Sequence, residues 1–129
     1  MKVFNSPKTK LPKKGTSMIV WKKILCPTGK TELLCKLRIP ARARRVEPLD
    51  KVQHGRTKGK CRAEWAIVVS IESETGNQVK AGISFFDVSF EYEVGKKVVP
   101  RNFNKSERLE CASGINFFKT KEEARNYIF

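Results

Sequence analysis

Two apolar runs of nine residues each flank a five-residue turn, and this arrangement constrains the fold more than any other feature of the sequence. The runs, residues 17–25 (SMIVWKKIL) and 31–39 (TELLCKLRI), are separated by CPTGK. Pro27 and Gly29 supply the backbone conformations that such a turn requires. The sequence therefore predicts an antiparallel β-hairpin over 17–39.

Further strand-like segments follow the hairpin. Residues 61–73 (CRAEWAIVVSIES) are predicted to form one strand, because their centre, AIVVSI, is rich in β-branched residues and continuously apolar, as in a buried strand. In residues 90–94 (FEYEV), apolar side chains alternate with glutamates, which indicates a half-buried strand. Further strands are expected in 78–86, 90–99 and 114–118.

The C-terminal segment carries the clearest signal for a helix. Thr120 and Glu123 form a capping box, T-x-x-E, at the start of KEEARNYIF. Ala124, Tyr127 and Ile128 then share one helical face. We therefore expect an α+β fold, a mostly antiparallel β-sheet with a single C-terminal α-helix and a flexible basic N-terminal arm.

The chain of 129 residues has the size of a single domain. Residues 1–16 contain two prolines, one glycine and five lysines but little that could be buried, so we expect a flexible basic arm there. Residues 17–129 are expected to form a single globular α+β domain. The chain shows neither the roughly 20 consecutive apolar residues of a membrane span nor the apolar core of a secretory signal, and we expect it in a cytoplasm.

Positive charge is concentrated in the first half of the chain. Residues 1–62 hold 18 Lys and Arg against three acidic residues, an excess of +15, whereas residues 63–129 hold 9 against 10, or −1. Charge of one sign in one region repels itself, and a polyanionic partner is the simplest compensation. Solubility alone would be served at least as well by acidic residues.

The densest basic segment is residues 36–48 (KLRIPARARRVEP), in which a predicted strand continues into closely spaced arginines. Arginine forks onto phosphate oxygens, and in an extended backbone Arg42 and Arg44 face one way and Arg45 the other. Because Trp21 is the only aromatic residue between residues 5 and 64, we expect contacts to phosphates rather than to stacked bases. The residues predicted to bind nucleic acid or phosphate are Arg38, Arg42, Arg44, Arg45, Lys51, Arg56, Lys58, Lys60 and Arg62.

A second candidate is the turn within residues 110–118 (ECASGINFF). Ser113 and Gly114 could present backbone N–H groups to a phosphate, with Asn116 beside them. The segment lacks the repeated glycines and the lysine of a nucleotide-binding loop. The alternative is a turn into a buried strand, with Phe117 or Phe118 in the core.

The four cysteines, Cys26, Cys35, Cys61 and Cys111, are expected to be free thiols, since a cytoplasm is reducing. They contain no C-x-x-C pair, and His54 is the only histidine, so no metal site is predicted.

The sequence contains few groups suited to catalysis. Cys61, Cys111, Ser113 and His54 are the candidates, and His54 lies in a polar, glycine-flanked loop where it would be poorly positioned. A Cys–His pair assembled from distant segments remains open. We expect a protein that is not an enzyme and has no cofactor.

Four motifs, in order, resemble an uncharacterised module found at the ends of pentapeptide-repeat proteins and as small accessory proteins of phages and large DNA viruses. They are KLRIPARARR, KCRAEWAIVVSI, FEYEVGKKVVP and ECASGINFFKTKEEARNY. The resemblance covers residues 22–129 and leaves residues 1–21 outside. Where that family is expected to have GIHFF, this chain has Asn116 in place of the histidine. The resemblance implies a viral origin and an accessory role.

Charge and resemblance together suggest a virus-encoded, non-catalytic protein in the cytoplasm of the host cell. It would bind a phosphate-rich partner, either nucleic acid or a nucleic-acid-bearing host complex, and act as a counter-defence inhibitor. One alternative is a small pocket that sequesters a signalling nucleotide. Another is a module that binds an acidic protein surface, and a homo-oligomer is also possible.

Overall fold

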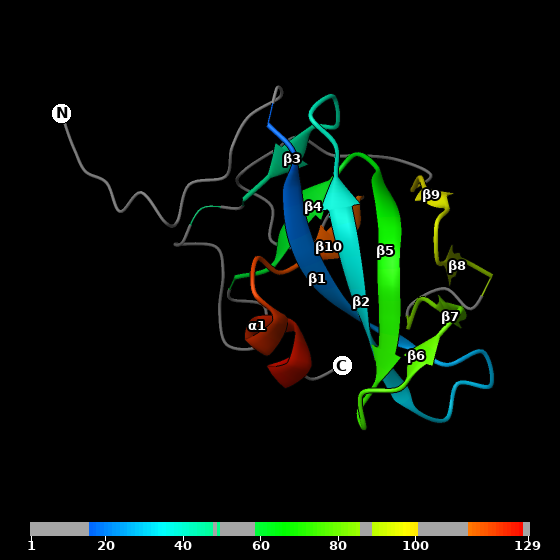
Figure 1. Ribbon diagram of the computed structural model, residues 1–129. Coiled ribbons are helices and arrows are strands. Elements are labelled where there is room, and N and C mark those ends of the chain that lie inside the picture. Colours follow the sequence, from blue (N-terminus) through cyan, green and yellow to red (C-terminus); the bar gives the residue numbers. More distant parts are fainter. Residues whose placement is uncertain (1–15, 48, 50–58, 86–88, 101–113, 128–129) are drawn as a thin grey trace, which may run out of the picture.

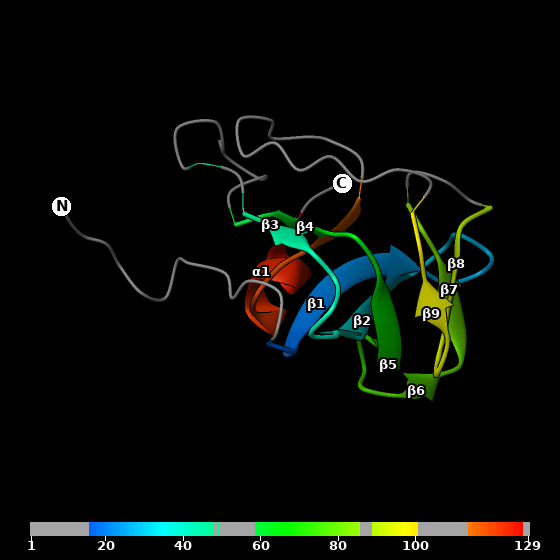
Figure 2. The ribbon, with the colours of Figure 1, turned by 90° about the horizontal axis from the view of Figure 1, so that it is seen from above.

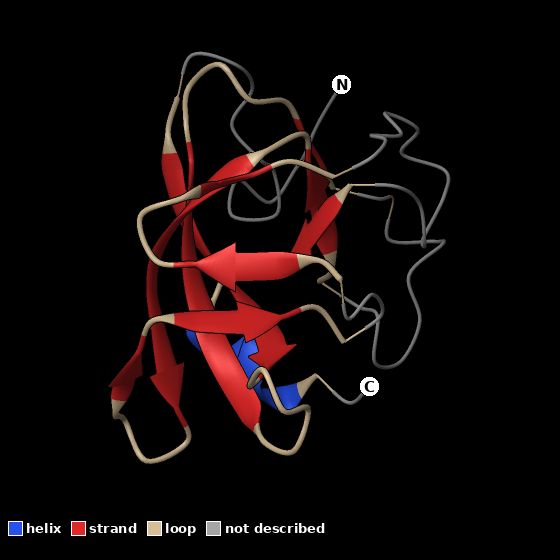
Figure 3. Ribbon diagram, turned by 90° about the vertical axis from the view of Figure 1, so that its right-hand side faces the viewer, coloured by secondary structure: helices blue, strands red, loops and turns tan. Residues whose placement is uncertain are grey.

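The computed structural model describes residues 16–47, 49, 59–85, 89–100 and 114–127. Strands make up about half of this part of the chain, the predominantly β fold that was predicted, and a single short helix follows them (Figure 1). In Figure 3 the strands are red and the helix, in blue, lies behind them. The strands are β1 (Met18–Leu25), β2 (Glu32–Ile39), β3 (Arg45–Val46), β4 (Cys61–Ala63), β5 (Ala66–Ser73), β6 (Gln78–Val79), β7 (Ala81–Ile83), β8 (Glu91–Glu93), β9 (Lys97–Val98) and β10 (Ile115–Phe117), and the helix is α1 (Lys121–Asn126).

The strands form two antiparallel sheets. The larger has the order β6-β5-β2-β1-β7-β8, with β9 paired to β5, and the smaller has the order β10-β4-β3. An isolated bridge between Trp21 and Phe118 joins β1 to the segment after β10. Seen from above, the small sheet and α1 lie on one side of the molecule and β7 to β9 on the other (Figure 2).

The predicted hairpin is confirmed. Strands β1 and β2 pair antiparallel along their whole length, from Met18 opposite Ile39 to Leu25 opposite Glu32. The turn between them closes with the Cys26 N–H donating to the Thr31 carbonyl at 2.9 Å. Gly29 has a φ of 77°, a conformation that glycine adopts without steric cost.

The prediction of one strand over 61–73 was wrong. The chain leaves the small sheet after β4 and enters the large sheet at β5, with Glu64 and Trp65 between them. The centre of β5 is also less buried than its composition suggested, because Val69 is 40% exposed. It lies where the pairing of β2 with β5 shifts register, so that Lys36 is opposite Ser70 and Leu37 opposite Val68.

The core lies on the inner face of the large sheet. Val20, Leu37 and Val68 form one buried row across β1, β2 and β5, and Phe117 of the small sheet belongs to the same cluster. The alternation predicted for 90–94 is confirmed at its centre, where Tyr92 is buried between two exposed glutamates. Both sheets therefore share one hydrophobic core.

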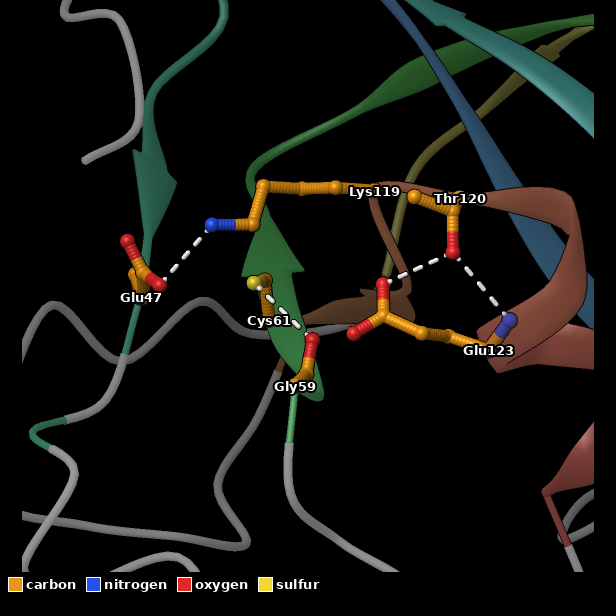
Figure 4. A network of polar contacts seen from close by, with 6 residues as sticks. All are labelled: Glu47, Gly59, Cys61, Lys119, Thr120 and Glu123. Atoms are coloured by element: carbon orange, nitrogen blue, oxygen red, sulfur yellow. Dashed lines mark hydrogen bonds and ion pairs between the residues drawn. The ribbon is translucent and has the colours of Figure 1, made fainter. Parts of the chain in front are cut away.

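The predicted helix is confirmed together with its N-cap, but it ends at Asn126, so Tyr127 has an extended backbone and does not share a helical face with Ala124. The Thr120 hydroxyl accepts the Glu123 N–H at 3.1 Å and donates to the Glu123 carboxylate at 3.0 Å (Figure 4). Ala124 and Tyr127 are buried against Leu34, Phe118 and the partly buried Trp21. The helix therefore covers one end of the outward face of β1 and β2, while Ile128 lies outside the described residues.

The predicted arm also falls largely outside the described residues, which begin at residue 16. Among the residues that the structure describes, no helix has the length and hydropathy needed to cross a membrane.

Candidate nucleic-acid interface

Strand register places four side chains of alternating character in one row across the large sheet. Ile19 pairs with Arg38, Arg38 with Ile67, and Ile67 with Lys97. Directly paired residues of antiparallel strands project from the same face of a sheet. We call this side the outer face, defined by Ile19, Trp21, Lys36, Arg38, Trp65, Ile67, Val69 and Lys97.

Both tryptophans of the chain lie on the outer face and contact lysines. Lys36 and Lys121 stand 5.7 Å and 5.2 Å from the ring centroid of Trp21. The ammonium of Lys97 lies 4.1 Å from the centroid of Trp65, which puts Trp65 on the same side as Lys97. Cation–π contacts at exposed sites contribute only about 0.5–1 kcal/mol each, so a competing ligand can replace them.

Three of the predicted arginines are exposed at the end of the outer face. Arg38 lies on β2, and Arg42 and Arg44 lie in the segment between β2 and β3. Within the described part of the chain, none of their guanidinium groups forms a hydrogen bond or ion pair. The Arg44 backbone is anchored, since its N–H donates to the Glu64 carboxylate at 3.1 Å and its carbonyl accepts the Glu64 N–H at 2.8 Å.

Arg45 is engaged within the protein instead. Its guanidinium donates to the carbonyl oxygens of Thr16 at 2.6 Å, Pro40 at 2.8 Å and Ala43 at 2.7 Å. Partial burial lowers the pKa of this guanidinium from its usual value. These hydrogen bonds link the turn after β2 to Thr16, which precedes β1, so Arg45 has a structural role.

Two other predicted residues are buried. Arg62 is 1% exposed and Lys60 is 6% exposed. The Lys60 ammonium donates to the Tyr127 hydroxyl at 3.2 Å and stands 5.1 Å from the centroid of that ring. Neither side chain lies on the exposed surface with Arg38. The predicted residues Lys51, Arg56, Lys58 and Ser113 lie outside the described residues.

Asn116 lies at a small cavity that contains more lysines than the sequence indicated. Lys22, Lys23 and Lys60 line it with Asn116, Tyr127, Ser84, Phe85 and Phe118. The Lys22 ammonium donates to the Asn116 carbonyl at 3.0 Å, and Lys23 forms an ion pair with Glu32 at 3.1 Å. Burial, and then the charge of Lys60, lowers the pKa of Lys22 to about 8.

The volume of this cavity limits what it can hold. It measures about 10 Å³, which is room for about one water molecule. Pockets for drug-sized ligands typically measure roughly 300–1,000 Å³.

The second candidate, the turn at Gly114, leads directly into β10. Gly114 precedes the buried residues Ile115 and Phe117 of that strand, which matches the alternative of a turn leading into a buried strand.

The described cysteines differ in environment. Burial raises the pKa of Cys35 and of Cys61 to about 12. Hydrogen bonds from Thr28 and then Thr31 lower the pKa of Cys26 to about 6. No group of three or more His, Cys, Asp and Glu suited to a metal ion occurs within the described ranges, and Cys111 and His54 lie outside them.

Comparison with known proteins assigns the chain to a family. A model of the family of unknown function DUF5758 matches residues 7–124. The chain belongs to that family. No curated protein and no solved structure matches it. The match begins at residue 7, so it includes most of the segment 1–21 that the motifs had left outside the resemblance.

Sequence reasoning missed part of the outer face of this DUF5758 protein. Lys36 and Arg38 alternate on a predicted strand, so their common face could have been found from the sequence. Trp65 and Lys97 join them only through the pairing of β5 with β2 and β9. Nothing local in the sequence indicates that pairing.

Proposed function

We propose that this chain is a non-catalytic protein that binds nucleic acid through its outer face and the adjoining arginines. The observation that supports this most is the exposure of Arg38, Arg42 and Arg44, whose guanidinium groups have no partner among the described residues. Lys36 and Lys97 extend the positive surface across the sheet.

The chemistry of these groups suits a phosphate backbone. Guanidinium forks onto phosphate oxygens with charge-assisted hydrogen bonds, which are roughly twice as strong as neutral ones. Glu72 forms an ion pair with Lys121 at 2.9 Å, whereas the Glu64 carboxylate accepts the neutral Arg44 N–H and keeps its charge. Within the described residues, Arg38, Arg42 and Arg44 form no ion pair, so an approaching polyanion need not displace a carboxylate from them.

The cavity beside Asn116 is too small to be the site of a sequestered nucleotide. The lysine-lined cavity beside Asn116 has room for about one water, whereas a nucleotide needs a far larger pocket. The exposed cations instead lie on an open strand surface, which suits an extended ligand. An acidic protein surface remains the further alternative.

The biological setting is part of the same proposal. The four sequence motifs resemble a module of phage and large DNA virus proteins and of pentapeptide-repeat proteins. On that resemblance we propose that the chain is a virus-encoded accessory protein of the host cytoplasm. There it would bind nucleic acid, or a host defence complex that carries nucleic acid, and inhibit the defence.

Purification of the protein tests this proposal. The ratio of absorbance at 260 and 280 nm is measured at low salt, and any released ligand is identified by mass spectrometry. Co-purifying nucleic acid that is removed by high salt supports the proposal. A single small nucleotide would favour the sequestering alternative, and a ligand-free protein that binds acidic peptides but no oligonucleotide would contradict it.

A further inference from the structure

We propose that the outer face selects single-stranded nucleic acid by stacking bases on Trp21 and Trp65. This inference rests on the proposed function and names its substrate class. The sequence had predicted phosphate contacts rather than base stacking, because Trp21 is the only aromatic residue near the basic segment in sequence. The fold adds Trp65 to the same surface.

The two tryptophans lie at the ends of a diagonal path across the sheet. Trp21 pairs with Lys36, and Arg38 follows two residues later on the same face of β2. Arg38 pairs with Ile67, and Trp65 precedes Ile67 by two residues. The path thus has a tryptophan at each end, with the two cations Lys36 and Arg38 and the apolar Ile67 between them.

Standard strand geometry gives the length of this path. Trp21 and Trp65 are two strand spacings apart across the sheet, about 10 Å, and about four residues apart along it, about 13 Å. Their separation is therefore about 16 Å, enough for a few nucleotides. For comparison, a single-strand-binding OB fold typically covers about 4–16 nucleotides.

The lysines beside the rings fit this role. Lys97 over Trp65, and Lys36 near Trp21, hold a positive charge next to an aromatic face. When a base stacks on the ring, its phosphate comes within reach of the displaced ammonium. The same residues thus supply a stacking platform and a phosphate contact, the combination that binds single strands.

Duplex nucleic acid offers a sharp contrast. Its bases are stacked within the helix and cannot reach the rings without unpairing, which costs free energy. Duplex DNA also has the denser charge, so a purely electrostatic surface loses more affinity with salt on duplex than on single strands. Preference for single strands at low salt therefore requires something other than phosphate contact.

Trp65 is the better residue to change. Trp21 helps to pack α1 against the sheet, so its removal would disturb the position of the helix. Its neighbours in this cluster are Leu34, Phe118, Ala124 and Tyr127. Trp65 is partly buried at the margin of the main core. Trp65→Leu keeps apolar contact there but removes the ring, and Trp65→Phe retains a smaller ring as the matched control.

The experiment is a titration of the full chain with a 12-nucleotide single strand and with the duplex of the same sequence, in one buffer. Intrinsic fluorescence reports on both rings, since the chain has only two tryptophans. We expect tighter binding of the single strand and quenching on saturation. Trp65→Leu should lose about tenfold in single-strand affinity, with duplex binding unchanged and Trp65→Phe intermediate.

The outcomes separate this inference from the proposed function. Equal or tighter binding of the duplex, without quenching, overturns the stacking inference and leaves nucleic-acid binding in place. Absence of binding to either oligonucleotide overturns both. Should circular dichroism show that Trp65→Leu is unfolded, quenching and strand preference of the unaltered protein decide the inference.

Discussion

The Arg45 guanidinium donates to the Thr16 carbonyl at 2.6 Å and thereby joins two segments that are 29 residues apart in sequence. Its further bonds to the carbonyls of Pro40 and Ala43 hold the turn between β2 and β3. The neighbouring residues Arg42, Arg44 and Arg45 therefore have different roles. Arg42 and Arg44 face solvent, whereas Arg45 holds the backbone that presents them.

The first prediction separates these roles. Arg45→Ala should lower the free energy of unfolding by about 1–3 kcal/mol, because it leaves carbonyl oxygens without their charged donor. The double variant Arg42→Ala with Arg44→Ala should stay within about 0.5 kcal/mol of the unaltered protein, since both side chains are exposed. Urea denaturation measures both. Equal unfolding free energies of the two variants would show that Arg45 has no structural role.

A second prediction concerns Cys26. Its thiol accepts the Thr31 N–H at 3.4 Å and lies 2.9 Å from the Thr28 hydroxyl. Since its pKa is lowered to about 6, the reactive thiolate is present at neutral pH and is lost as the pH falls through 6. Alkylation of Cys111→Ser protein should modify Cys26 first, half-maximally near pH 6.

The buried thiols and Thr28 provide the controls for this measurement. Cys35 and Cys61, with pKa values of about 12, should stay unmodified until the protein unfolds. Thr28→Val should shift the rate profile of Cys26 to higher pH. Unchanged kinetics in Thr28→Val would show that this hydroxyl does not stabilise the thiolate.

A third prediction concerns Lys22, which is paired with Cys35 across the hairpin. Burial, and then the charge of Lys60, lowers the pKa of Lys22. Its folded pKa of about 8 lies below the ordinary value of 10.5, so between these values the unfolded chain binds more protons. The free energy of unfolding contributed by Lys22 therefore rises with pH over that window.

The difference between the unaltered protein and Lys22→Met isolates this group. Relative to the variant, the unaltered protein should gain up to about 3 kcal/mol between pH 8 and 10.5, since each pKa unit corresponds to about 1.4 kcal/mol. Urea denaturation at several pH values gives the difference. A difference that stays constant would mean that Lys22 is solvated like an ordinary lysine.

The elements predicted correctly are those encoded by neighbouring residues. The hairpin depends on Pro27 and Gly29 within its turn, and the helix depends on Thr120 and Glu123 three residues apart. The break at Glu64 arises instead because the residues before it pair in the small sheet and those after it pair in the large sheet. No local sequence pattern indicates this change of sheet.

The same distinction applies to the candidate site. Exposure of Arg42 follows from its position after Pro40, near a chain reversal. The burial of Arg62 could not be predicted, because a basic residue within a short strand says nothing of what packs over it. The place of Trp65 on the outer face depends on pairings between distant strands.

A fourth prediction concerns Arg38. It is exposed at the end of the outer face, near the end of β2, so Arg38→Ala should leave the unfolding free energy nearly unchanged. Its loss should weaken nucleic-acid binding similarly across sequences, as expected for a phosphate contact. Fluorescence anisotropy with several oligonucleotides measures this. An effect confined to one sequence would assign Arg38 to base recognition instead.

The salt dependence of affinity tests the central claim most directly. The dissociation constant of an oligonucleotide is measured at several salt concentrations for the unaltered protein and for Arg38→Ala with Arg42→Ala. If these arginines bind phosphates, the logarithm of the association constant falls linearly with log salt with a slope of several units, and the double variant lowers the size of that slope by about 2. An affinity that does not change with salt, or a slope unaffected by the double variant, would contradict the account.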